Sequence, residues 1–472
     1  MYDLPVASHY PGTTRSSSGA VLNATRYDLA MPTDRRRALA FSWLALGLAA
    51  LAASGIFSLL LVVSRTPGLN AIFPVADFFR VTLVAHVDFS VLVWFLAFGA
   101  MLWSVAGGPR AIAAGWIALA VAAAGATTMA IAPFVQAARP VMANYVPVLD
   151  GPVFIAGLAI FALGITMACA RGMAVYVPAG ARADGASALR LGLNASMVAA
   201  GMAAFAFAAS FAQVDRALDA ATYYELLFWG AGHVLQFAYT LLMLVAWIWL
   251  ASAIGAHVAL PPRAAAFLFA IALAAVYVTP YIYLAHPVAS IEHPKLQTWL
   301  MRFGGGLAVP PIALAVAWAL VRTRGLEAAA RPLRASLAAS LILFSAGGLI
   351  GFTIDGANVR VPAHYHGCIV GVTLAMMGLT YLLLPRFGYP APVSRLAIRQ
   401  PWIYGFGQLL HILGLVISGG YGVQRKVAGA EQVLRSTPEV IGMAVMGIGG
   451  LIAIVGGLAF LVVVVRSLRG RG

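Results

Sequence analysis

The chain has 472 residues, of which 62% are hydrophobic and only 10% are charged. A water-soluble protein of this length needs a far more polar surface, so the composition excludes the soluble globular class. In a soluble domain the net charge of +15 would suggest nucleic acid as a partner. In a chain this apolar, the basic residues are better explained as determinants of membrane topology, and we expect no nucleic-acid partner.

The chain begins with a polar segment, residues 1–37, which ends in Arg35-Arg36-Arg37. We predict that it is a disordered cytoplasmic tail. Apolar stretches follow that are each long enough to cross a lipid bilayer as a helix. They predict an all-α polytopic membrane protein with one transmembrane domain at 38–466 and a cytoplasmic tail at 467–472. About twelve helices are expected, at 38–63, 79–105, 111–136, 150–170, 191–213, 223–254, 264–286, 298–321, 335–354, 362–384, 401–420 and 440–465.

The basic residues indicate the orientation of these helices. With the N-terminus inside, the inner segments carry about twice as many Lys and Arg residues as the outer ones, which supports two cytoplasmic termini. The only cysteines, Cys169 and Cys368, each lie within an apolar stretch. This chain therefore lacks the thiolates needed for a binuclear copper site or an iron–sulfur cluster.

Histidines are the most informative polar residues of the predicted helices. Of the nine in the chain, His9 and His257 fall in the tail and in an inner loop. A single histidine in a membrane helix is usually a hydrogen-bonded interior residue, and we interpret the mid-helix His411 in this way. Several histidines at one depth instead predict haem or metal ligation, because imidazole suits iron and copper. The candidates in the outer half of the membrane are His86, His233, His286, His293, His364 and His366.

Two of these candidates stand two residues apart at the start of one helix. In Ala363-His364-Tyr365-His366-Gly367 the histidine side chains diverge by about 200° around the helix axis. They cannot easily chelate one metal, but they can bind two metals on opposite sides of the helix. Such an arrangement would place two redox centres side by side.

Three segments resemble helices of a known family. "FFRVTLVAHVDFSVLVWFLAFGAML", "LFWGAGHVLQFAY" and "NVRVPAHYHGCIVGVTLAMMGLTYLLLP" are similar to helices 2, 6 and 10 of the catalytic subunit (subunit I) of the haem–copper oxidase superfamily. The likeness is closest to nitric oxide reductases and C-type oxidases. It implies a haem-binding domain at 38–466 in a bacterial inner membrane, with lipid around it and electron transport in a respiratory chain as its setting.

The resemblance implies two haems and a second metal. His86 and His366 would be the axial ligands of a low-spin haem, and His364 the proximal ligand of a high-spin haem. Arg360 would lie near the haem propionates, since a guanidinium pairs well with carboxylates. His233 would be a copper ligand.

Helix 7 departs from the family, which has two adjacent histidines there. This chain reads "YIYLAHPVASIEHP", so His286 and His293 are the candidates to complete the metal site. Copper, another metal ion, iron and no second metal all stay open at this point.

The residues near His233 bear on the substrate. One turn after it, oxygen reductases carry a tyrosine and nitric oxide reductases a glutamate, whereas this chain has Phe237 with Gln236 beside it. Gln236 and Tyr281 are the catalytic candidates, Tyr281 because C-type oxidases draw their tyrosine from helix 7. Two-electron reduction of NO needs no redox tyrosine. No carboxylate lies within the inner halves of the predicted helices, which suits proton uptake from outside. We therefore favour reduction of NO, with a cytochrome c or quinol oxidase reducing O₂ as the alternative.

The chain lacks a CxxCH haem-attachment motif and a thiolate copper motif. A cytochrome c or cupredoxin-like subunit is therefore implied as the electron donor to the small gas substrate. Two other classes compete with a terminal reductase. A transporter predicts binding residues near the membrane midplane and paired halves, and a non-catalytic haem protein predicts haem without turnover.

Overall fold

The computed structural model describes residues 26–65, 77–178, 184–425 and 434–470. Twelve helices in these ranges are long and apolar enough to span a membrane, which confirms the predicted all-α membrane fold. Each coincides with one of the twelve predicted segments. In chain order the elements are α2 (Arg36–Arg65), α3 (Phe78–Val87), η2 (Asp88–Val93), α4 (Trp94–Ala106), α5 (Ile112–Val135), β1 (Arg139–Val141), β2 (Val148–Asp150), α6 (Pro152–Ala174), α7 (Gly185–Gln213), α8 (Ala220–Ala253), α9 (Pro262–Val276), α10 (Val278–Ala285), α11 (Glu292–Trp299), η3 (Leu300–Gly305), α12 (Val309–Arg322), α13 (Ala330–Gly351), α14 (Arg360–Phe387), α15 (Arg395–Gly420) and α16 (Thr437–Leu468).

Several helices begin up to six residues before their predicted starts. The first turns of α7, α8 and α15 precede the strongly apolar part of each span, and a capping side chain closes each of them. Asp184 accepts a hydrogen bond from the Ser187 amide, Asp219 accepts from the amides of Ala221 and Thr222, and Ser394 accepts from the Ala397 amide. Such caps satisfy amides that have no partner within the helix. Hydropathy alone misses these turns because they lie outside the apolar stretch.

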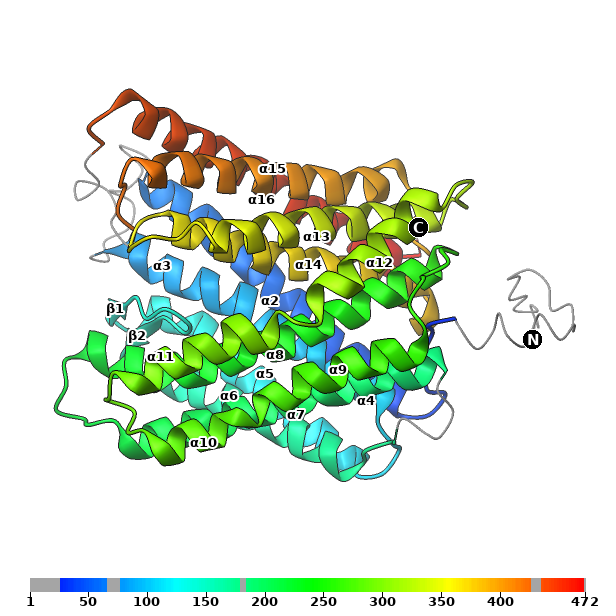
Figure 1. Cartoon of the computed structure of the whole chain (residues 1–472), viewed down its shortest axis with the longest axis horizontal. Coiled ribbons are helices and arrows are strands. Elements are labelled where there is room, and N and C mark those ends of the chain that lie inside the picture. Colours follow the sequence, from blue (N-terminus) through cyan, green and yellow to red (C-terminus); the bar gives the residue numbers. More distant parts are fainter. Residues whose placement is uncertain (1–25, 66–76, 179–183, 426–433, 471–472) are drawn as a thin grey trace, which may run out of the picture.

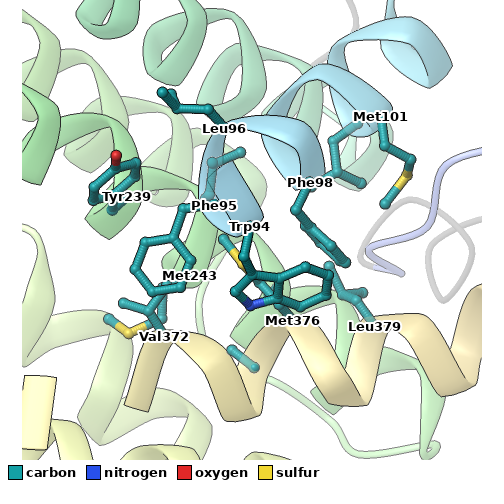
Figure 2. Packing of buried hydrophobic residues seen from close by; sticks show 14 of the residues in the cluster. Trp94, Phe95, Leu96, Phe98, Met101, Tyr239, Met243, Val372, Met376 and Leu379 are labelled. Carbon is teal, nitrogen blue, oxygen red and sulfur yellow. The ribbon is translucent and has the colours of Figure 1, made fainter. Parts of the chain in front are cut away.

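Three membrane spans form the centre of the bundle. In α3–η2–α4, α8 and α14, 83%, 83% and 89% of the most apolar window is buried, against at most 50% in every other span. Figure 2 shows how α4, α8 and α14 interlock through Trp94, Phe95, Tyr239, Met243 and Met376. These central spans also carry His86, His233, His364 and His366. The candidate ligands therefore lie on the helices that the rest of the bundle surrounds.

The two ends of the bundle differ. The described parts of the chain nearest both termini lie at one end, which we call the terminal end (Figure 1). At the opposite end, the hairpin end, β1 and β2 form a small antiparallel hairpin in which Pro140 pairs with Leu149. The sequence did not predict this hairpin, because three-residue strands leave no periodic signal.

The start of the described chain packs on the bundle. Tyr27 is only 1% exposed, its amide donates to the Ser252 hydroxyl at 3.0 Å, and its own hydroxyl donates to the Leu260 carbonyl at 2.6 Å. Asp28 forms an ion pair with Arg386 at 2.7 Å. Residues 26–37 thus differ from the predicted disordered tail, because they have specific partners at the terminal end. Residues 1–25 lie outside the described residues.

Candidate functional site

The two histidines that open α14 point to different neighbours. Nδ1 of His364 lies 2.7 Å from the Gly347 carbonyl oxygen of α13. A methyl group added at Gly351, also on α13, would come within 2.7 Å of the same nitrogen. The His366 ring instead faces α15, where its centroid lies 4.9 Å from that of His411. The structure therefore places the two imidazoles on different sides of α14, as their spacing predicted.

A second feature is the way in which His86, His366 and His411 are oriented. Their Nδ1 atoms lie 3.0, 2.8 and 3.0 Å from the carbonyl oxygens of Ser54, Pro362 and Met446. A carbonyl oxygen can only accept, so each Nδ1 carries the proton and leaves the lone pair on Nε2. This arrangement is typical of ligating histidines, whose other nitrogen donates to a backbone carbonyl. His86 also interacts electrostatically with both His366 and His411, so the three rings belong to one cluster.

The histidine cluster and His364 fit the two haems that the sequence implies. All four rings are half-buried in the bundle, so each keeps a face that protein atoms do not cover. His86 and His366 lie on separate central spans, so their rings could hold one haem. His364 points Nδ1 at the Gly347 carbonyl oxygen and so keeps the lone pair of Nε2, with which it could hold the other. His411 is a third imidazole beside His366, and the sequence did not predict that the two rings would be neighbours.

A buried carboxylate accompanies His86. Asp88 begins the π-helix η2 and is 1% exposed, and within the described residues neither of its oxygens has a hydrogen-bond partner. The Tyr239 hydroxyl on α8 is also buried without a partner there, and it interacts electrostatically with Asp88. Short π-helical turns frequently mark functional sites. Asp88 and Tyr239 therefore mark a polar point in the apolar core between the second and sixth spans.

His233 on α8 is engaged at both ring nitrogens. Its Nδ1 lies 2.7 Å from the Trp229 carbonyl oxygen, and its Nε2 lies 2.9 Å from the hydroxyl of Tyr145. Tyr145 comes from the loop between β1 and β2. Tyr145 carries no signal in the sequence, because it lies between two predicted helices and in none of the segments that resemble the family. It is a functional candidate that the sequence did not predict.

The histidines near helix 7 do not join His233. His286 follows the last residue of α10, where the backbone is extended, and it is half-buried. His293 on α11 is 1% exposed, with its Nδ1 3.2 Å from the His286 carbonyl oxygen and its ring against that of Tyr283. Throughout the part of the chain that the structure describes, no three His, Cys, Asp or Glu residues are grouped so that they could hold a metal ion. The residues present therefore do not fit a three-histidine copper site.

The remaining residues predicted from the sequence are Tyr281, Gln236 and Arg360, and they differ in burial and in their contacts. Tyr281 is 65% exposed on α10, whereas Tyr283 is 6% exposed and its hydroxyl lies 2.8 Å from that of Ser210. Gln236 is half-buried on α8. Arg360, at the start of α14, forms an ion pair with Asp355 at 3.3 Å, and among the described residues its buried Nε has no partner. An Nε–H without a protein acceptor fits a guanidinium that binds a carboxylate of another molecule.

Comparison with known proteins gives relatives over most of the chain. A protein of Rickettsia prowazekii (strain Madrid E), itself uncharacterized, is 27% identical over 493 aligned positions, which cover 90% of this chain and 95% of the relative. An uncharacterized protein of Aquifex aeolicus (strain VF5) is 27% identical over 350 positions, or 74% of this chain and 85% of the relative.

The solved structures include a similar fold. A heme-copper terminal oxidase dimer, studied by cryo-EM, matches with a TM-score of 0.68 over 92% of this chain and 84% of that chain. At 15% identity this likeness supports the fold alone. Residues 38–458 match the family described as "Cytochrome C and Quinol oxidase polypeptide I". This match spans nearly all of the membrane bundle, so the chain belongs to the haem–copper oxidase subunit I family of membrane oxidoreductases.

Proposed function

We propose that this chain is the catalytic subunit of a terminal reductase whose substrate is a diatomic gas, NO in preference to O₂. The observation that carries the proposal is the pair on α14, in which His364 faces α13 and His366 faces His411. When bound, haem iron would supply electron transfer and gas binding. The protein would supply His86 and His366 as ligands of the low-spin haem and His364 as the ligand of the high-spin haem.

The residues around these ligands would fix their orientation. The carbonyl oxygens of Ser54, Pro362 and Gly347 hold the Nδ1–H groups of His86, His366 and His364. Such partners set the ring plane and raise the basicity of Nε2. Arg360 would bind haem propionates through its unpartnered Nε–H.

Two observations bear on the substrate, and they point in opposite directions. Phe237, 1% exposed, stands where common oxygen reductases carry a tyrosine, and this favours NO. Tyr145 is hydrogen-bonded to His233 and could act as a redox tyrosine, which keeps O₂ as the second candidate. We further propose a bacterial inner-membrane location and an electron-donor subunit of the cytochrome c or cupredoxin type.

The experiment that tests the proposal is spectroscopy of the detergent-purified protein from cells that supply haem. We expect two haems per chain, only one of which changes its reduced spectrum when CO or NO is added. Turnover of NO and of O₂ with an artificial donor would then identify the substrate. A preparation without haem would refute the proposal, and haem without turnover of either gas would favour a non-catalytic haem protein.

The two tyrosines of α10 give a separate prediction. Changing Tyr283 to Phe removes the buried contact with the Ser210 hydroxyl, so we expect the free energy of unfolding to fall by about 1–2 kcal/mol. Changing the exposed Tyr281 to Phe is expected to alter it by less than about 0.5 kcal/mol. Thermal unfolding of both variants in detergent measures the difference. If Tyr281 is catalytic, as the sequence predicted, its variant should lose turnover while its melting temperature stays unchanged.

A further inference from the structure

The β1–β2 hairpin is hydrogen-bonded to α8 through its loop and through its second strand, and to Arg425 through its loop. The backbone amide of Asn144 donates to the Glu225 carboxylate at 3.0 Å. The Arg425 guanidinium donates to the side-chain oxygen of Asn144 at 3.1 Å. The Tyr224 hydroxyl on α8 donates to Asp150 on the second strand at 2.8 Å. The hairpin loop therefore has a fixed position over the hairpin end of α8.

This fixed loop places the Tyr145 ring directly on the backbone of α8. A methyl group added at Gly232 would overlap the Tyr145 side chain, so the close approach requires glycine there. The Tyr145 ring also packs edge-on against Trp229, with centroids 5.8 Å apart, and lies 4.7 Å from the His233 ring. The Tyr145 side chain is thus held by contacts with Gly232, Trp229 and His233.

The chemistry of His233 follows from its two contacts. Because the Trp229 carbonyl oxygen can only accept, Nδ1 carries the proton and Nε2 carries the single lone pair of the ring. That lone pair accepts the hydrogen bond from the Tyr145 hydroxyl at 2.9 Å. A tyrosine phenol is protonated at neutral pH, so Tyr145 is the donor in this bond.

The other histidines that a second metal would need are not grouped with His233. His293 points Nδ1 at the His286 carbonyl oxygen and packs against Tyr283, and its buried Nε2 has no partner among the described residues. His286 follows the last residue of α10. Copper and other divalent ions of this series bind well only where several imidazole or thiolate donors converge. In the described parts of the chain, no three His, Cys, Asp or Glu residues are grouped so that they could hold a metal ion, around His233 or elsewhere.

We propose that the Tyr145–His233 hydrogen bond takes the place of the second metal, so that His233 is a hydrogen-bond acceptor and not a metal ligand. Tyr145 is then a positioning residue that fixes the His233 ring. The proposal deepens the proposed function, because it states that the gas-reducing site holds haem iron without a neighbouring copper or non-haem ion.

The metal content of the holoprotein tests this proposal. Wild type and His233→Ala would be purified from copper-replete cells, incubated with copper under reducing conditions, desalted and analysed for all transition metals and for haem. We expect iron equal to haem, and copper far below one per chain and the same in both proteins. One copper or non-haem iron per chain in the wild type, lost in His233→Ala, would overturn the proposal. Haem is counted separately, so a haem-free preparation would refute the proposed function alone.

The hydrogen bond itself has a matched control. Tyr145→Phe removes the donor to His233, and Tyr224→Phe removes from α8 the donor of an exposed hydrogen bond to Asp150 of the same hairpin. We expect Tyr145→Phe and Gly232→Ala to lower the melting temperature clearly, and Tyr224→Phe to change it little. Equal melting temperatures for wild type and Tyr145→Phe would show that the Tyr145–His233 contact is not formed, which would also overturn the proposal.

Discussion

Changing His366 to Ala is expected to remove about half of the bound haem and to abolish turnover with an external electron donor. The variant should keep the haem on His364, because the two rings lie on different sides of α14 and have separate partners. Its remaining haem should therefore still bind CO when it is reduced chemically. An axial imidazole contributes directly to haem affinity and potential, so no neighbouring residue is expected to replace it without a change in the spectrum.

The measurement is the haem content per chain together with the reduced-minus-oxidised spectrum, with and without CO. His411→Ala is the matched control, because His411 has the same Nδ1–carbonyl arrangement and lies 4.9 Å from His366. We expect it to keep both haems. The opposite pattern, with haem lost in His411→Ala and retained in His366→Ala, would assign the axial ligand to α15.

The sequence predicted the parts of this protein that depend on local periodicity. Twelve apolar stretches gave twelve spans, since a helix must be about 20 residues long to cross a bilayer. The divergence of His364 and His366 follows from 3.6 residues per turn and needs no knowledge of the neighbouring helices. Their partners, Gly347 and His411, could not be predicted in this way, because they depend on how α13 and α15 pack against α14.

The sequence could not predict the surroundings of His233 for a related reason. Tyr145 reaches His233 from 88 residues away, in a loop whose position depends on contacts with Glu225 and Arg425. The helix 7 histidines illustrate the same limit. Their sequence placed them at the predicted outer end of a helix. Only the positions of the side chains in space show that, among the described residues, they form no metal-holding group with His233.

The contact between α13 and α14 holds His364 in place. At Gly347 the backbones of the two helices approach each other closely. A methyl group added at Gly347 would lie 2.5 Å from the Cys368 amide nitrogen and 2.8 Å from the His364 carbonyl oxygen. These are backbone atoms, so α14 itself would have to move. We expect Gly347→Ala to lower the free energy of unfolding by about 1–3 kcal/mol, the usual cost of overpacking a close contact.

The same variant should loosen the high-spin haem, because moving α14 away from α13 separates Nδ1 of His364 from the carbonyl oxygen of residue 347, its acceptor. Loss of such a partner typically costs about 10–100-fold in affinity at a metal-bound histidine. Gly348→Ala is the control, since outside the backbone of α13 itself no atom of the described residues lies within 4 Å of the added methyl group, and alanine favours the helix. Melting temperature and CO-reactive haem should fall together in Gly347→Ala and stay unchanged or rise in Gly348→Ala. A Gly347→Ala protein that loses stability but keeps its CO-reactive haem would show that His364 is oriented by α14 alone.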